Sequence, residues 1–166
     1  MRLLIYHKKE CNPKKCTALK LEKFGFVELF YTLKMIPKNT ILLSPHSDKA
    51  LSRKDSKFSS ITALDCSWKN TLQAFKKVKG IPRILPYLIA ANDVNYGKPT
   101  KLSTAESLAS SLYILGKKQK ALNIVEKFSW CKAFMDLNLE MLEAYSHAKD
   151  SKEIIEIQKQ FMEAIK

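Results

Sequence analysis

The chain of 166 residues is 46% hydrophobic and 27% charged, which is typical of one compact unit with a buried core. It has no apolar run of 18 residues, and the apolar stretch within MRLLIYHKKE is too short for a signal peptide. We therefore expect a cytoplasmic protein that has no membrane span.

Basic residues outnumber acidic ones by 29 to 16, and the excess is unevenly distributed along the chain. Residues 1–60 carry 13 basic and 5 acidic side chains, residues 61–102 carry 7 and 2, and residues 103–166 carry 9 of each. This segregation predicts that a polyanion, with RNA the first candidate, contacts the first two thirds of the chain. The side chains predicted to bind phosphates, unless they only form a solvated surface, are Lys8, Lys9, Lys14, Lys15, Arg53, Lys54 and Lys57.

The first half alternates between short apolar runs and helical patterns. Continuous apolar runs are typical of strands buried in a parallel sheet, and they occur at residues 2–6, 40–43, 61–64 and 83–91, with a further one at 27–31. Helices are predicted between them at residues 17–24 and 70–79. The rhythm indicates an α/β domain with a parallel sheet over residues 1–90.

The remaining sequence favours consecutive helices, because all six prolines precede residue 100. Ser103 and Glu106, in the segment STAE, form the pattern of a capping box at a helix start. That helix is expected to end at Gly116, and further helices are predicted at residues 118–128, 133–148 and 151–165. A helical C-terminal domain is thus predicted over residues 91–166, including the loop before Ser103.

Several well-known sites are excluded by the motifs that the sequence lacks. There is no G-x-G-x-x-G, no G-x-x-x-x-G-K-[ST], no H-E-x-x-H and no G-x-S-x-G. Cys11 and Cys16 follow His7, but no second Cys/His pair follows at ligand spacing, so no metal is predicted. A cofactor without phosphates, such as S-adenosylmethionine, remains compatible with the sequence.

Polar side chains follow each of the main predicted strands, at His7, Ser44, Asp65 and Asn92. Ligands of open parallel sheets bind beyond the carboxyl ends of the strands. We therefore expect one site along this rim.

Four segments together resemble one known family. They are KKECNPKKCTALKL, LDCSW, RILPYLIAANDVNYGKP and KLSTAESLA. They are similar to the small-subunit rRNA aminocarboxypropyltransferase family, and the last two also resemble the cofactor-binding segment of the SPOUT superfamily. The resemblance spans nearly the whole chain, and one departure is Asp93, where the family usually has Pro.

This resemblance implies a parallel sheet with a SPOUT-like trefoil knot. It also implies transfer of the 3-amino-3-carboxypropyl group of S-adenosylmethionine to N3 of a pseudouridine-derived nucleotide, with release of methylthioadenosine. The implied partner is small-subunit rRNA or its precursor particle, and the protein is expected to be a monomer.

Site residues also follow from the resemblance. Thr17 would contact the amino-acid end of the cofactor, and Asp65 would face the reacting group as the catalytic residue. The adenosine and sulfonium would be enclosed by Leu43, Pro45 and Trp68. The adenine and ribose would be bound by backbone groups of Leu64, of Leu88 and of the stretch 95–104, which includes Asn95, Tyr96, Ser103 and Thr104.

Other interpretations of these residues stay open. Asp65 is equally suited to cap a following helix, and Trp68 to fill a core. The same fold also serves RNA methyltransferases, which would release adenosylhomocysteine, and a non-catalytic RNA-binding assembly factor would retain no cofactor.

Overall fold

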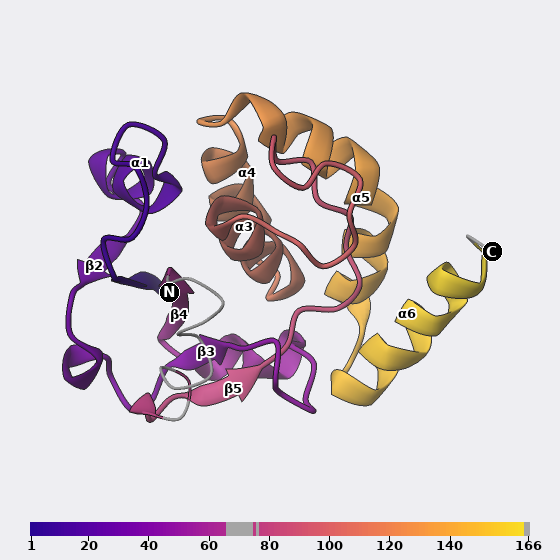
Figure 1. Ribbon diagram of the computed structural model, residues 1–166. Coiled ribbons are helices and arrows are strands. Elements are labelled where there is room, and N and C mark those ends of the chain that lie inside the picture. The colour runs from indigo at the N-terminus through magenta and orange to yellow at the C-terminus, as the bar shows by residue number, and fades with distance from the viewer. Residues whose placement is uncertain (66–74, 76, 165–166) are drawn as a thin grey trace.

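The computed structural model describes residues 1–65, 75 and 77–164, and its central feature there is a five-stranded parallel sheet (Figure 1). The strands are β1 (Arg2–His7), β2 (Glu28–Phe30), β3 (Ile41–Leu43), β4 (Ser60–Asp65) and β5 (Ile81–Arg83). Their spatial order is β2-β1-β4-β3-β5. The predicted parallel sheet is confirmed, and its register places His7 directly beside Asp65.

The sheet is covered on both faces, as the continuous apolar runs predicted. On one face, Leu3 and Ile5 of β1 join a large core that also contains residues of α1 (Thr17–Lys23) and of the C-terminal helices. On the other face, Leu42 packs with Ile36 and Val78 in a smaller cluster. The short 3-10 helices η1 (Leu33–Met35) and η2 (Arg53–Lys57) lie between the strands in sequence.

Consecutive helices make up the described C-terminal part, in agreement with the sequence. They are α3 (Thr104–Ile114), α4 (Lys118–Val125), α5 (Ser129–His147) and α6 (Ser151–Ala164). Helix α5 begins four residues before the predicted position 133, because Cys131 continues the buried face formed by Phe134 and Asn138. The helix predicted at residues 70–79 lies mostly outside the described residues.

Helix α3 is central to the molecule, and nearly all of its side chains are buried. It packs against β4, α1, α4 and α5, and in Figure 1 it lies between the sheet and the other C-terminal helices. Small residues such as Ala105 and Ala109 allow this close approach on several sides. The buried hydroxyls of Ser110 and Ser111 donate to carbonyls one turn back, at 2.7 and 2.6 Å.

The prediction of one strand over residues 83–91 is wrong. Strand β5 ends at Arg83, after which Ile84 makes a single bridge to Ala50 and the chain crosses to the helices. Pro86 has no backbone N–H for a sheet. From Tyr87 on, the backbone bonds with helix side chains and with residues 97–100 in place of a neighbouring strand. An apolar run signals burial, and here the burial is against helices.

Among the described residues, none of the helices combines the length and the apolar character that crossing a membrane requires.

Candidate active site

A cavity of about 550 Å³ opens beyond the carboxyl ends of β3 and β4. The segment 84–86, the loop 100–103 and the first turns of α3 complete its walls. Six residues predicted from the sequence line it together: Leu43, Pro45, Leu64, Asp65, Ser103 and Thr104. The cavity therefore lies at the carboxyl ends of the parallel strands, where a ligand site is expected, and the predicted residues line it.

Of the other predicted cofactor residues, those that the structure describes do not line this cavity. Leu88 is fully buried, and its carbonyl accepts from the Thr100 N–H at 2.9 Å, so that it holds the loop which lines the cavity. Asn95 belongs to a turn, and Tyr96 is 65% exposed. Thr17 is the first residue of α1 and half-buried. Trp68 lies outside the described residues.

The loop between residues 92 and 103 is anchored by one buried carboxylate. Glu106 is fully buried and accepts from three donors: the Ala91 N–H at 2.8 Å, Asn92 Nδ2 at 2.8 Å and the Ser103 N–H at 2.6 Å. The Glu106 N–H bonds the Ser103 hydroxyl in return, which confirms the predicted capping box. Asn92 extends this network by donating to the Lys101 carbonyl at 3.1 Å and accepting from the Asn95 N–H at 3.1 Å.

The same loop holds a backbone conformation that few residues adopt. Thr100, which lines the cavity, has φ of 61°, in the left-handed region that is rare for a β-branched residue. Its N–H bond to Leu88 helps to fix this conformation. Such outliers persist where the surroundings impose them, and they cluster at ligand sites.

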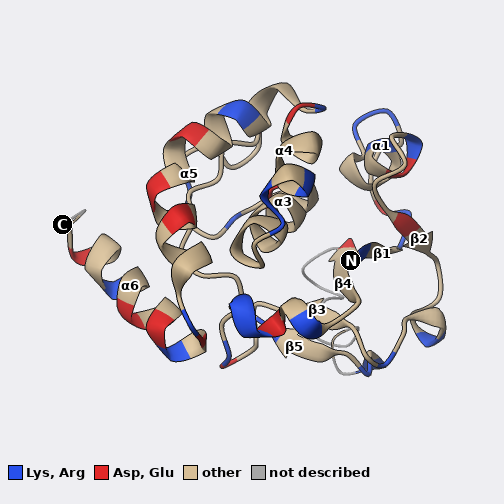
Figure 2. Ribbon diagram, turned by 180° about the vertical axis from the view of Figure 1, so that it is seen from behind, with Lys and Arg blue, Asp and Glu red and all other residues tan. Residues whose placement is uncertain are grey.

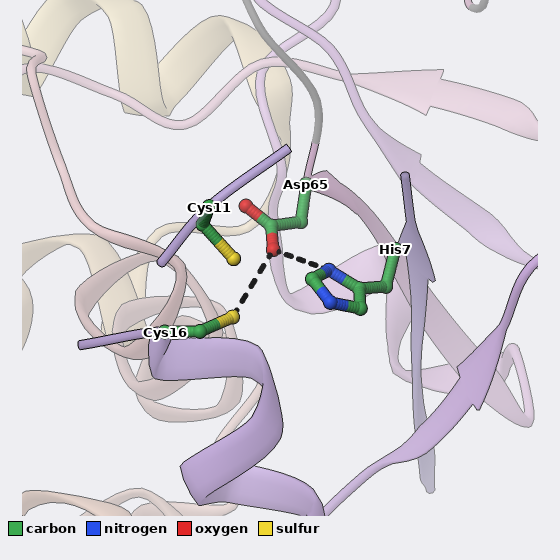
Figure 3. Close-up of side chains that lie close together, drawn as sticks. All are labelled: His7, Cys11, Cys16 and Asp65. Atoms are coloured by element: carbon green, nitrogen blue, oxygen red, sulfur yellow. Dashed lines mark hydrogen bonds and ion pairs between the residues drawn. The ribbon is translucent and has the colours of Figure 1, made fainter. Parts of the chain in front are cut away.

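Asp65 faces a second group of side chains besides the cavity. Figure 3 shows His7 from β1, Cys11 and Cys16 from the loop before α1, and Asp65 from the end of β4 pointing toward one another. The His7 Nδ1 lies 2.9 Å from Asp65 Oδ2, and the Cys16 thiol donates to the same oxygen at 3.9 Å. Burial raises the pKa of the Cys11 thiol to about 12, and its contacts with Cys16 and Asp65 add to this rise.

Comparisons with known proteins give matches along nearly the whole chain. The family described as "Ribosome biogenesis protein, C-terminal" matches residues 41–162, and "Possible Fer4-like domain in RNase L inhibitor, RLI" matches residues 1–31. The 16S rRNA aminocarboxypropyltransferase of Methanosphaera stadtmanae is 46% identical over 169 residues, which cover 98% of each chain. That of Methanocaldococcus jannaschii is also 46% identical, covering 97% of this chain and 96% of its own. The chain belongs to the 16S rRNA aminocarboxypropyltransferase family.

A solved structure extends the likeness to three dimensions. The SAM-dependent rRNA:acp-transferase of Vulcanisaeta distributa has a TM-score of 0.84 and 34% identity to this aminocarboxypropyltransferase-family chain. The match covers 99% of this chain and 97% of the other.

The basic residues predicted to bind phosphates form two groups with different surroundings, one before α1 and one on η2, which carries Arg53, Lys54 and Lys57. Lys8, Lys9, Lys14 and Lys15 are exposed in the loop between β1 and α1, near the Asp65 end of the sheet. On η2, Arg53 donates to the Ser146 carbonyl at 3.2 Å, and Lys54 pairs with Asp150 at 3.2 Å. The η2 group therefore also joins the sheet region to α5 and to the turn before α6.

Sequence reasoning on this aminocarboxypropyltransferase-family chain missed part of the cavity and the cysteine cluster beside it. Ser44 lies on the predicted rim and Leu102 within the predicted stretch 95–104, although neither side chain was given a role of its own. Ile84 and Pro86 were missed because they were assigned to the strand predicted over residues 83–91. The predicted rim already grouped His7 with Asp65, but no sequence pattern indicated that Cys11 and Cys16 would join them.

Proposed function

We propose that this protein transfers the 3-amino-3-carboxypropyl group of S-adenosylmethionine to N3 of a pseudouridine-derived nucleotide in small-subunit rRNA. The observation that carries the proposal is the cavity at the ends of β3 and β4, where Asp65 lies among the walls expected for the cofactor. Membership of the aminocarboxypropyltransferase family, supported over nearly the full chain, selects this reaction.

The lining of the cavity suits S-adenosylmethionine. Leu43, Pro45 and Leu85 offer apolar surface for the adenosine, while Ser103 and Thr104 offer hydroxyls for polar groups. Asp65 supplies a carboxylate for a positively charged ligand. The volume of about 550 Å³ lies within the range of small-molecule sites.

The proposed mechanism depends on positioning and one proton acceptor. When bound, the cofactor supplies an activated carbon next to its sulfonium, and the carbon–sulfur electrons leave with the sulfur as methylthioadenosine. Asp65 would accept the N3 proton of the nucleotide as nitrogen bonds to that carbon. His7, buried at 3% exposure and 2.9 Å from Asp65, would hold the carboxylate in place. The cavity walls would expose the carboxypropyl carbon and cover the methyl group.

Further parts of the proposal follow from the family likeness. Thr17, Leu88, Asn95, Tyr96 and Trp68 would complete the cofactor site, and the chain beyond Asn92 would form the trefoil knot. The lysines before α1 would bind rRNA or its precursor particle. We keep the monomeric state, the cytoplasmic location and the division into domains at residue 90 as predictions.

A labelling experiment tests the reaction. The protein is incubated with small-subunit rRNA that contains the modified nucleotide, and with S-adenosylmethionine labelled separately in the carboxyl carbon and in the methyl group. We expect the carboxyl label in RNA together with methylthioadenosine, and no label in a transcript that carries uridine at the target. Methyl label with adenosylhomocysteine would identify a methyltransferase, and failure to bind the cofactor would identify an assembly factor.

A further inference from the structure

Four potential metal ligands converge beside the cavity, and the proposed transfer reaction does not need a metal. His7, Cys11, Cys16 and Asp65 each offer one ligand atom, and these atoms all lie within 4.8 Å of one another (Figure 3). His7 and Cys16 are buried at 3% and 4% exposure, and Cys11 and Asp65 are half-buried. We propose that this cluster is a binding site for one zinc ion.

The ligand set and its spacing favour zinc. Zinc is bound by cysteine, histidine and carboxylate groups, four at a time, in a tetrahedron with bonds of about 2.0–2.3 Å. In such a tetrahedron the ligand atoms are about 3.3–3.8 Å apart. Side chains that already lie within 4.8 Å need only small rotations to close on the ion. The loop from Lys8 to Lys15 is exposed and has no regular secondary structure, so it can take up this adjustment.

An iron–sulfur cluster does not fit the same residues. The family that matches residues 1–31 is described as Fer4-like, but this segment contains only Cys11 and Cys16. A ferredoxin-type cluster is held by four cysteine thiolates. The histidine and the carboxylate that complete the set here are ligands of a single borderline ion.

The surrounding charge also suits an occupied site. Two thiolates and one carboxylate around Zn²⁺ leave one net negative charge. Lys8, Lys9, Lys14 and Lys15 belong to the same loop and would offset it. The ion would in turn fix that basic loop to the end of β4. Binding through Asp65 Oδ2, which already faces His7 and Cys16, leaves the other Asp65 oxygen without a metal bond and able to accept the N3 proton. The ion, bound to both His7 and Asp65, would then hold the carboxylate in place of their direct hydrogen bond.

Metal content tests the proposal without RNA or S-adenosylmethionine, so its outcome is independent of the proposed function. The full chain is purified from zinc-supplemented medium, and the metals are measured by mass spectrometry. We expect one zinc per chain. We also expect a strong chelator to lower the melting temperature and added Zn²⁺ to restore it, since the ion binds the folded state. Cobalt(II) should replace zinc, with the absorption of a thiolate-bound tetrahedral ion.

Variants assign the ion to the cluster. Cys11→Ser and Cys16→Ser should lose the ion and the cobalt absorption. The matched control Cys131→Ala, which removes a buried thiol of α5, should keep both. The cobalt titration of the unaltered chain tests ion binding even if a variant fails to fold. Zinc-free wild-type protein that does not take up the ion, iron with sulfide, a Cys11–Cys16 disulfide, or full zinc content in folded Cys11→Ser would each overturn the proposal.

Discussion

Glu106 shows how much of this site depends on one side chain. It lies in the first turn of α3, and it holds Ala91, Asn92 and Ser103, which flank the loop that lines the cavity. A buried carboxylate is costly unless it is fully hydrogen-bonded, and here three N–H donors satisfy it. The polar residues that follow residue 91 therefore fix the loop 92–103 to helix α3.

Glu106→Gln should destabilise the protein and loosen this loop. One Oε would become an NH₂ group that cannot accept from Asn92 or Ser103, which leaves buried donors without partners. We expect a loss of about 3 kcal/mol in the free energy of unfolding, measured by urea denaturation. Glu140→Gln on the exposed side of α5 is the matched control and should change it by less than about 0.5 kcal/mol. Equal stability of the two variants would contradict the anchoring role.

At the level of the elements, the C-terminal helices act as the pairing partners of residues 87–91. Gln158 of α6 accepts from the Tyr87 N–H at 2.8 Å, and Tyr145 of α5 donates to the Tyr87 carbonyl at 3.1 Å. Asn138 of α5 bonds both the N–H and the carbonyl of Ile89, at 2.7 and 2.8 Å. Its amide therefore takes the place of a neighbouring strand, and the helices position the segment that leads into the loop 92–103.

Asn138→Leu should break this pairing while keeping the number and branching of the side-chain heavy atoms. It would leave the N–H and carbonyl of Ile89 without partners in a buried place, at a cost of about 2–4 kcal/mol. Hydrogen exchange should rise at residues 87–97 more than in β1 or β4, and S-adenosylmethionine should bind more weakly. The control is Asn123→Leu on the exposed face of α4, where protection of residues 87–97 should not change. Unchanged exchange in Asn138→Leu would contradict the pairing role.

Across the molecule as a whole, one hydrophobic core joins the sheet to the helices, while charge divides them. Leu3 and Ile5 of the sheet share a core with Leu108 and Ile154 of the helices. Figure 2 shows acidic and basic residues mixed along α5 and α6, whereas Lys and Arg dominate the loop before α1 and η2. An RNA is therefore expected to approach the sheet end that carries the cavity, away from the helices, where the two charges balance.

The double variant Lys14→Glu/Lys15→Glu should weaken RNA binding and leave cofactor binding unchanged. If each lysine contacts one phosphate, the slope of log affinity against log salt should become shallower by about 1.5. Lys152→Glu/Lys159→Glu on α6 changes the net charge equally and should have a much smaller effect. Titrations of fluorescent rRNA at several salt concentrations measure both. The same loss in the two variants would show that net charge, and not this loop, determines binding. We exclude Arg53 from this test because it also bonds α5.

Local and periodic features of this protein could be predicted from its sequence alone. Buried parallel strands, the capping box of Ser103 and Glu106 and the C-terminal helices depend on patterns within a few residues, and the structure confirms them. Six of the predicted site residues converge on the cavity, because the carboxyl ends of parallel strands must meet at one edge. The family likeness supplied the reaction, which no residue pattern here defines.

The meeting of distant groups, in contrast, depends on the packing of the whole chain. An apolar run reports that residues 83–91 are buried, but it does not distinguish a neighbouring strand from the side chains of Asn138 and Gln158. Likewise, Cys11 and Cys16 lacked a second ligand pair in sequence, and the parallel register of β1 and β4 supplied it by placing His7 beside Asp65. Contacts between residues far apart in sequence depend on how complete helices and strands pack. Patterns within a few residues of the sequence therefore cannot predict them.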